Sequence, residues 1–306
     1  MTAERFAAAL AALAVPDTTA LGVAVSGGPD SLALLLLAAQ ARPGQVLAAT
    51  VDHGLRPEAA HEAEHVAAIC RNLGVPHEVL IVHVEGSVQA GARAARYQAL
   101  GGWCFRAGLG WLATAHHVDD QAETLLMRAA RGSGVAGLAG VRRSRVFRPD
   151  VRLVRPLLDW RKSELEAIVD AADLKPVLDR SNEDPAYDRT AARALLRQTP
   201  WLQPERLAQS AANLADAEAA LDWATDRAAD EYVHGDSLDP SCLPDEIVRR
   251  LMVRLFEHFG ESPRGPELAR LIARLRAGDP GTLGRVKVTP GPRWTFAPAP
   301  PRRIDQ

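Results

Sequence analysis

A short apolar run that breaks into a glycine turn, LGVAVSGGPDS at positions 21–31, constrains the fold more than any other stretch. The run at 21–25 is apolar and compatible with a buried parallel strand. Gly27 and Gly28 then let the backbone turn sharply and lie close to a ligand without a Cβ atom in the way. The long apolar run at 32–39 predicts a buried helix directly after the turn.

This order of strand, glycine turn and helix N-terminus predicts an anion site. Free N–H groups and the positive end of the helix dipole point to the same place, which favours a phosphate. A Walker-type loop is excluded because the first lysine of the chain is Lys162. The GxGxxG pattern of dinucleotide-binding folds is also absent after the strand. An ordinary glycine turn without a ligand is the alternative.

Strand-like and helix-like segments alternate through the first two thirds of the chain. Further strands are expected at 46–51, 79–84 and 109–114, and helices at 57–73, 89–100, 121–131 and 162–172. This alternation predicts an α/β fold with a doubly wound, mostly parallel sheet. We expect a first domain over residues 1–198.

The character of the sequence changes after residue 198. Helical patterns follow at 203–232, 245–259 and 267–277, and short segments with β character at 286–288 and 294–296. We therefore expect a second, mainly helical domain over residues 199–306, with proline-containing turns at the boundary.

Cysteine usage and hydropathy point to a reducing compartment. The chain has three cysteines with no CxxC pair, and they are interpreted as small buried residues. The apolar N-terminus predicts an amphipathic helix on the domain surface, with a weak signal peptide as the alternative. No uncharged apolar run is long enough to predict a membrane span, so we expect a cytoplasmic protein without membrane contact.

A second polar cluster follows the strand expected at 109–114. It consists of His116, Asp119, Asp120 and Glu123, and Asp119 and Glu123 share one face if a helix begins there. Crowded carboxylates beside a phosphate loop suit Mg²⁺ bound to ATP, or an amine whose pKa they set. Two other interpretations stay open: an acidic first turn that complements the helix dipole, and a zinc site.

Positive charge is concentrated between residues 142 and 162. Eight basic residues lie there against two acidic ones, although the formal net charge of the chain is only −2. Such a segment attracts phosphates and steers nucleic acid, and the alternative is a solvated charged surface. We expect its arginines Arg142, Arg143 and Arg145 to contact RNA together with the helical domain after Trp201. By itself, the polar stretch at 179–193 predicts only a loop with helix caps.

Six motifs in this order resemble the tRNA(Ile)-lysidine synthetase family of PP-loop ATP pyrophosphatases, and they span nearly the whole first domain. They are SGGPDS at 26–31, VDHGLRP at 51–57, ARAARYQAL at 92–100, TAHHVDDQAETLLMRAARGSGVAGLAG at 114–140, RPLLDWRKSEL at 155–165 and LDRSNEDPAYDRTAAR at 178–193.

The resemblance implies a ligase that uses ATP, Mg²⁺ and free L-lysine. In this family, ATP adenylates the C2 oxygen of the wobble cytidine in the CAU anticodon of isoleucine tRNA. The ε-amine of lysine then attacks C2, and AMP leaves. Two other functions stay open: a PP-loop synthetase or amidotransferase acting on a small substrate, and an ATP-binding module without catalysis.

The resemblance also implies a role for each residue that matches a family motif. The residues implied to bind ATP are Ser26, Gly27, Gly28, Pro29, Asp30 and Ser31. Asp30 is in addition the implied Mg²⁺ ligand, and the implied catalytic residues are Asp30, His53, Arg93 and His116. Asp119 and Glu123 are implied to hold the lysine ammonium, and Arg189 and Arg193 to contact tRNA phosphates.

The chain departs from the family pattern at two positions. Gln89 stands where the pattern has Glu, and Thr190 where it has Asn, which puts one polar contact in doubt at each position. We also expect a short family form without the further C-terminal domain of longer members. A homodimer is compatible with this pattern.

Overall fold

The structure is a computed structural model that describes residues 2–52, 58–82, 89–177 and 188–299. Side chains are described for the same residues except 58–60, 89–90 and 92–93. The chain divides into two compact units, Met1–Ala215 and Asp216–Gln306. The division falls inside one continuous helix, α9 (Pro204–Tyr232), and later than the expected boundary after residue 198.

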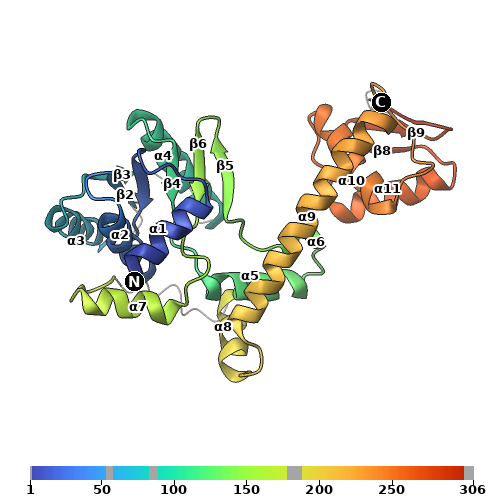
Figure 1. Ribbon diagram of the computed structural model, residues 1–306. Helices are drawn as coiled ribbons and strands as arrows, with labels where there is room; N and C mark the ends of the chain where they lie inside the picture. The colour runs from blue at the N-terminus through green and yellow to red at the C-terminus, as the bar shows by residue number, and fades with distance from the viewer. Residues whose placement is uncertain (1, 53–57, 83–88, 178–187, 300–306) are drawn as a thin grey trace. The chain divides into compact units, whose positions relative to one another are not determined.

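Unit 1 is built on a six-stranded sheet in the order β3-β2-β1-β4-β6-β5 (Figure 1). All neighbours pair in parallel except β5 and β6, which form an antiparallel pair at one edge. The strands are β1 (Leu21–Ala24), β2 (Val46–Asp52), β3 (His77–Ile81), β4 (Trp111–Ala113), β5 (Ser144–Arg148) and β6 (Val151–Val154).

Helices cover both faces of this sheet. On one face α1, α2, α3 and α7 bury a shared apolar core, and on the other α4 packs Leu100 and Trp103 against the strands. The helices of unit 1 before α9 are α1 (Thr2–Ala12), α2 (Pro29–Ala41), α3 (Glu58–Asn72), α4 (Gln89–Arg106), α5 (Val118–Ala130), α6 (Val135–Leu138), α7 (Lys162–Ala171) and α8 (Asp188–Gln198). The doubly wound, mostly parallel sheet is therefore confirmed.

Strands β5 and β6 and helix α8 of unit 1 differ from the sequence-based expectation. The arginine-rich segment contains the hairpin β5–β6, which the charge count concealed. Its apolar residues alternate with polar ones, because Val151 and Leu153 are buried on α4 while Arg152 faces outward. Part of the stretch expected as a loop at 179–193 is helix α8.

Unit 2 combines helices with a small antiparallel sheet in the order β7-β10-β9-β8. Its elements, besides the last turns of α9, are β7 (Ser237–Leu238), α10 (Asp245–His258), α11 (Gly265–Arg276), β8 (Gly281–Leu283), β9 (Val286–Thr289) and β10 (Trp294–Pro298). Its core joins Leu251 and Phe256 of α10 to Trp294 and Phe296 of β10. The two segments with expected β character lie in β9 and β10, which pair with each other and with the short strands β7 and β8.

No described helix is both long and apolar enough to cross a membrane.

Candidate functional site

The glycine turn lies between the end of β1 and the first turn of α2. The Ser31 hydroxyl donates to the Gly28 carbonyl oxygen at 2.9 Å and accepts from the Ser26 amide at 3.1 Å. The Ser26 hydroxyl lies 3.2 Å from the same Ser31 oxygen. These bonds close the turn on itself, so the N–H groups of the first turn of α2 face the space beyond β1.

The two glycines of the turn have different reasons to be glycine. Gly27 has a φ of +84°, and a Cβ atom there would lie 3.0 Å from Val177 Cγ2. Gly28 has an ordinary φ of −71°, and a Cβ atom there would meet no atom of the described residues closer than 3.8 Å. The fold therefore requires Gly27, whereas Gly28 leaves a bare backbone beside the helix N-terminus, as close approach of a ligand requires.

Asp30, in the first turn of α2, fits a cation-binding role. Its Oδ1 atom is buried and has no hydrogen-bond partner among the described residues, and such an atom is costly unless a ligand satisfies it. Among the described residues no three His, Cys, Asp or Glu side chains form a ready-made metal site. Mg²⁺ does not need one, because it binds through one or two carboxylates together with substrate phosphates. The zinc interpretation gains no support.

His117 connects this turn to the acidic first turn of α5. Its Nε2 lies 3.5 Å from an Asp30 oxygen and 3.6 Å from an Asp120 oxygen, and its Nδ1 lies 3.6 Å from Asp119. Burial disfavours the imidazolium, but the three carboxylates outweigh burial and raise the pKa of His117 to about 10. His117 therefore links the glycine turn to the first turn of α5.

Asp119 is engaged at the start of α7. Its carboxylate accepts from Arg161 Nη2 at 2.9 Å and from the Lys162 amide at 2.8 Å. Burial alone would raise its pKa, yet His117, Arg161 and the Lys162 amide together lower the pKa of Asp119 far below the ordinary range. Asp119 thus fixes the N-terminus of α7 as well as facing the site.

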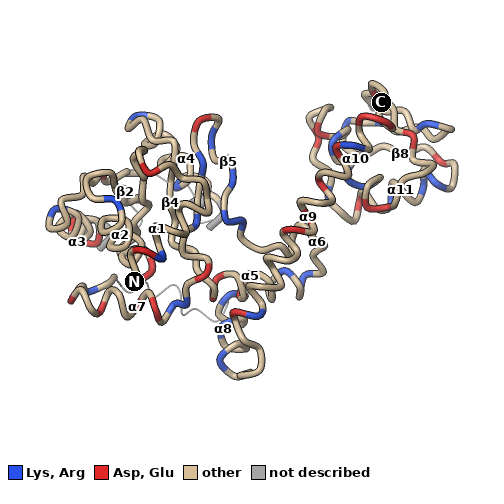
Figure 2. Tube along the Cα trace, in the orientation of Figure 1, with Lys and Arg blue, Asp and Glu red and all other residues tan. Residues whose placement is uncertain are grey.

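Glu123 lies one turn further along α5, and its side chain is only 4 % exposed. Its two oxygens accept from Arg189 Nε at 2.6 Å and from Arg193 Nε at 2.7 Å. Arg189 also donates to Asp120 at 2.9 Å. Acidic and basic segments accordingly meet where α5 and α8 lie side by side (Figure 2).

The expected catalytic residues are described to different extents. His116 lies before α5, and its Nδ1 is 3.2 Å from Thr114 Oγ1. Arg93 belongs to α4, but its side chain and all of His53 lie outside the described residues, as does the side chain of Gln89. Thr190 lies in the first turn of α8.

Much of the arginine-rich segment is engaged within the protein. Arg143 pairs with Asp159 through two bonds of 2.6 and 2.5 Å, and Arg161 is held by Asp119. Arg145 is exposed, and its guanidinium lies 5.3 Å from the centre of the Tyr97 ring. The segment is therefore a hairpin with a basic edge rather than a uniformly free charged surface (Figure 2).

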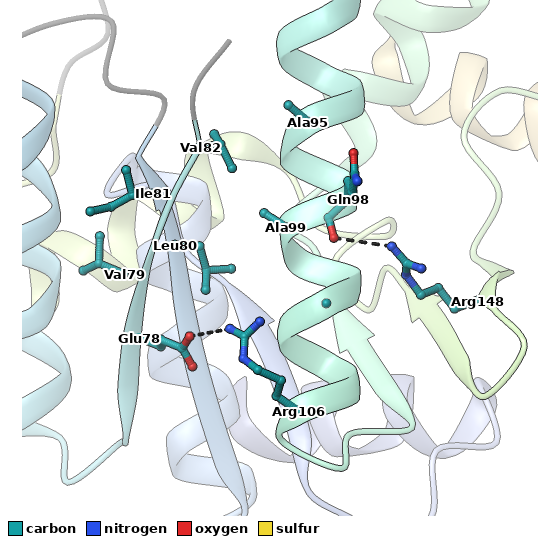
Figure 3. Close-up of a pocket in the computed structure, with 11 residues that line it drawn as sticks. Glu78, Val79, Leu80, Ile81, Val82, Ala95, Gln98, Ala99, Arg106 and Arg148 are labelled. Atoms are coloured by element: carbon teal, nitrogen blue, oxygen red, sulfur yellow. Dashed lines mark hydrogen bonds and ion pairs between the residues drawn. The ribbon is translucent and has the colours of Figure 1, made fainter.

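A cavity of about 610 Å³ lies elsewhere, between β3 and α4 (Figure 3). Its charged side chains are already engaged, since Arg106 contacts Glu78 at 2.5 Å and Arg148 donates to the Gln98 carbonyl at 3.4 Å. No residue of the glycine turn or of α5 lines it. The chemistry is better placed at the turn, because buried carboxylates and a helix N-terminus converge there.

Sequence analysis missed two residues of the site, His117 and Arg161. The pair of histidines before α5 led to His116, yet His117 is the buried one, with its amide 3.1 Å from Asp120. An acidic residue three positions after the N-cap residue is typical of a capping box, and Asp120 stands three positions after His117. This pattern could have placed His117 at the N-cap of α5. No local pattern predicts that Arg161 reaches Asp119.

Comparison with known proteins agrees with this architecture. The family model of the PP-loop domain matches residues 2–199. The tRNA(Ile)-lysidine synthase of Zymomonas mobilis is 45% identical over 303 residues, covering 95% of this chain and 92% of that protein. The tRNA(Ile)-lysidine synthase of Novosphingobium aromaticivorans is 46% identical, covering 93% of this chain and 90% of that protein.

A solved structure supports the fold alone. The U34-tRNA thiolase NcsA of Methanococcus maripaludis has a TM-score of 0.59 at 16% identity, covering 70% of this chain and 78% of that one. The family model matches residues 2–199, and this chain covers nine tenths or more of the length of both relatives. These two findings identify the family. The chain belongs to the tRNA(Ile)-lysidine synthase family of PP-loop ligases.

Proposed function

We propose that this protein ligates free lysine to C2 of the wobble cytidine in the CAU anticodon of isoleucine tRNA, at the expense of ATP. One observation carries the proposal beyond family membership. The phosphate loop and the acidic turn of α5 lie against each other, joined by His117 at 3.5 Å from Asp30 and 3.6 Å from Asp120. The ATP site and the amine site that we propose are therefore adjacent.

The reaction has two displacements. The C2 oxygen of cytidine attacks the α-phosphorus of ATP, and pyrophosphate leaves. The neutral ε-amine of lysine then attacks C2, the C2–O bond breaks, and AMP leaves with its electron pair. The N–H groups of the glycine turn bind the phosphates, and the bare backbone at Gly28 allows their approach. Asp30 would hold Mg²⁺, which neutralises phosphate charge when bound.

Glu123 and Asp119 are the carboxylates that we assign to the lysine ammonium. An ammonium must be bound and then deprotonated before it attacks, and carboxylates can do both. Glu123 is the better placed of the two, because Asp119 also fixes the start of α7. His116, His53 and Arg93 are proposed to surround the cytidine.

The tRNA surface is proposed to include the exposed basic edge of the β5–β6 hairpin. Arg145 lies over an aromatic ring there, and exposed arginines beside aromatic rings suit both phosphates and unstacked bases. Because tRNA and free lysine meet in the cytoplasm, we place the reaction there.

The proposal is tested by AMP formation. We expect AMP only when ATP, lysine and unmodified isoleucine tRNA are all present, and none from an Asp30→Ala variant that keeps the wild-type melting temperature. Asp150→Ala, in the exposed turn of the β5–β6 hairpin, is the matched control and should keep full activity.

Other results point to other functions. AMP formation without tRNA indicates a small-molecule synthetase, and ATP binding without any AMP indicates a non-catalytic module. Normal AMP formation by Asp30→Ala removes Asp30 from the site.

A further inference from the structure

Glu123, which we assign to lysine binding, and its neighbour Asp120 are already paired with cations of the chain itself. Arg189 and Arg193 take one oxygen each of Glu123, at 2.6 and 2.7 Å. At Asp120, one oxygen accepts from Arg189 at 2.9 Å and the other from the His117 amide at 3.1 Å. An incoming ammonium therefore finds no free carboxylate oxygen on either residue.

Charge balance makes simple addition of lysine unfavourable. The carboxylates of Asp30, Asp119, Asp120 and Glu123 face the guanidinium groups of Arg161, Arg189 and Arg193 and the imidazolium of His117, so the cluster is balanced in charge. Glu123 is nearly fully buried, and a further positive charge beside it would be neither solvated nor paired. A lysine ammonium that approaches Glu123 would therefore compete with a guanidinium group for this carboxylate.

Helix α8, which carries both arginines, is attached to unit 1 mainly through charges. Ala192 is its only buried side chain, and Leu195 is 46 % exposed. A further ion pair joins Asp188 of α8 to Arg131. Moving the helix away from α5 would thus expose little apolar surface and would mainly exchange ionic partners.

We infer that Arg189 and Arg193 close the lysine site in the tRNA-free enzyme, and that tRNA phosphates open it by drawing these guanidinium groups away from Glu123. The inference rests on the proposed function. A guanidinium fork matches phosphate oxygens as well as it matches a carboxylate, so the exchange replaces one anion by another. The same two arginines thereby serve tRNA binding and control lysine access.

Lysine and tRNA then bind cooperatively. Because coupling between two ligands is reciprocal, tRNA raises the affinity for lysine by the factor by which lysine raises the affinity for tRNA. A coupling of this kind commonly amounts to about 5–150-fold. The amine would enter only once the cytidine that it attacks is present.

Equilibrium dialysis with radiolabelled lysine tests the inference. With wild-type enzyme, we expect unmodified isoleucine tRNA to raise lysine affinity at least about fivefold. Arg193→Ala should bind lysine without tRNA about as tightly as wild-type enzyme does with it, because Glu123 then keeps only one guanidinium.

Two variants serve as controls. Arg193→Lys retains a cation near Glu123 and should keep much of the tRNA dependence. Arg197→Ala, on an exposed position of the same helix, should leave tRNA-free lysine affinity at the wild-type value. Thermal melts with and without lysine check that Arg193→Ala is folded, and lysine alone should raise the melting temperature of that variant more than that of the wild type.

The outcomes separate this inference from the proposed function. Equal lysine affinity of the wild-type enzyme with and without tRNA overturns the inference and leaves the proposed function intact. So does a folded Arg193→Ala variant that gains no affinity for lysine. No lysine binding to any variant, even with tRNA and a non-hydrolysable ATP analogue, contradicts the proposed function itself.

Discussion

Replacing each glycine of the phosphate loop by alanine should separate folding from ligand binding. In Gly28→Ala the new methyl group has space among the described residues, since its nearest neighbours there lie 3.8 and 4.0 Å away. Reduced freedom of the unfolded chain favours the variant by about 0.4–1 kcal/mol. Loss of a glycine N-cap costs a similar amount, roughly 0.5–1 kcal/mol. The free energy of unfolding should therefore change by less than about 1 kcal/mol.

ATP binding should respond quite differently to Gly28→Ala. If phosphates lie against the backbone at Gly28, the methyl group overpacks the site by about 1–3 kcal/mol, which corresponds to about 5–150-fold weaker binding. Calorimetric titration with ATP and a thermal melt of the same sample measure both quantities. Wild-type ATP affinity in Gly28→Ala would refute close approach of the phosphates at this residue.

Gly27→Ala is the matched comparison. Here the left-handed backbone, with φ +84°, costs roughly 1–2 kcal/mol, and the contact with Val177 adds about 1–3 kcal/mol. For a unit of this size the melting temperature should fall by roughly 5–15 °C. An unchanged melting temperature would show that the loop adapts to a side chain there.

Three further predictions concern the cysteine thiols, the arginine-rich segment and His117. Burial raises the pKa of the Cys70 and Cys104 thiols to about 11, so one thiol of the native protein and three thiols of the denatured protein should react rapidly with Ellman's reagent. Two rapidly reacting thiols in the native protein would contradict this burial. Arg142→Glu should weaken tRNA binding and reduce the slope of log affinity against log salt by about 0.7–0.9 or more, with an unchanged melting temperature. Arg143→Glu should also lower the melting temperature, because it breaks the pair with Asp159. An unchanged slope in both variants would place the tRNA elsewhere. Burial lowers the pKa of His117, but the surrounding carboxylates outweigh burial and raise this pKa from 6.5 to about 10, so the stability advantage of the wild type over His117→Gln should be full below pH 6.5 and decline as the pH rises to 10. Urea unfolding of both proteins at several pH values measures this advantage, and an advantage that grows with pH would contradict the assignment.

The sequence predicts the sheet because each of its parallel strands is visible as a short apolar run. The apolar runs before the glycine turn and before the acidic cluster became β1 and β4, which are neighbours in the sheet. Parallel strands bring their carboxyl ends to one edge, so the meeting of Asp30 with the residues before α5 also follows from sequence order.

The hairpin β5–β6 shows where charge misled the prediction. Arginines dominate its composition, yet the apolar residues Val151 and Leu153 carry the two-residue period of a strand. In this segment the two-residue spacing of the apolar residues predicts the strand, and the arginines predict only its exposed face.

Long-range ion pairs cannot be predicted from local patterns. Glu123 is paired with arginines 66 and 70 residues further along the chain, and only the packing of α8 on α5 brings them together. The family resemblance therefore implied lysine binding for Glu123 and tRNA binding for Arg189 and Arg193 without any link between them. The structure adds that link.

Transfer of labelled lysine to unmodified isoleucine tRNA tests the central claim most directly. With ATP present, we expect one labelled lysine per tRNA, attached at the wobble cytidine, and one AMP for each lysine transferred. A transcript with uridine in place of that cytidine should take up no label. ATP-dependent AMP formation without label in the tRNA, or equal labelling of the uridine transcript, would contradict the proposed function.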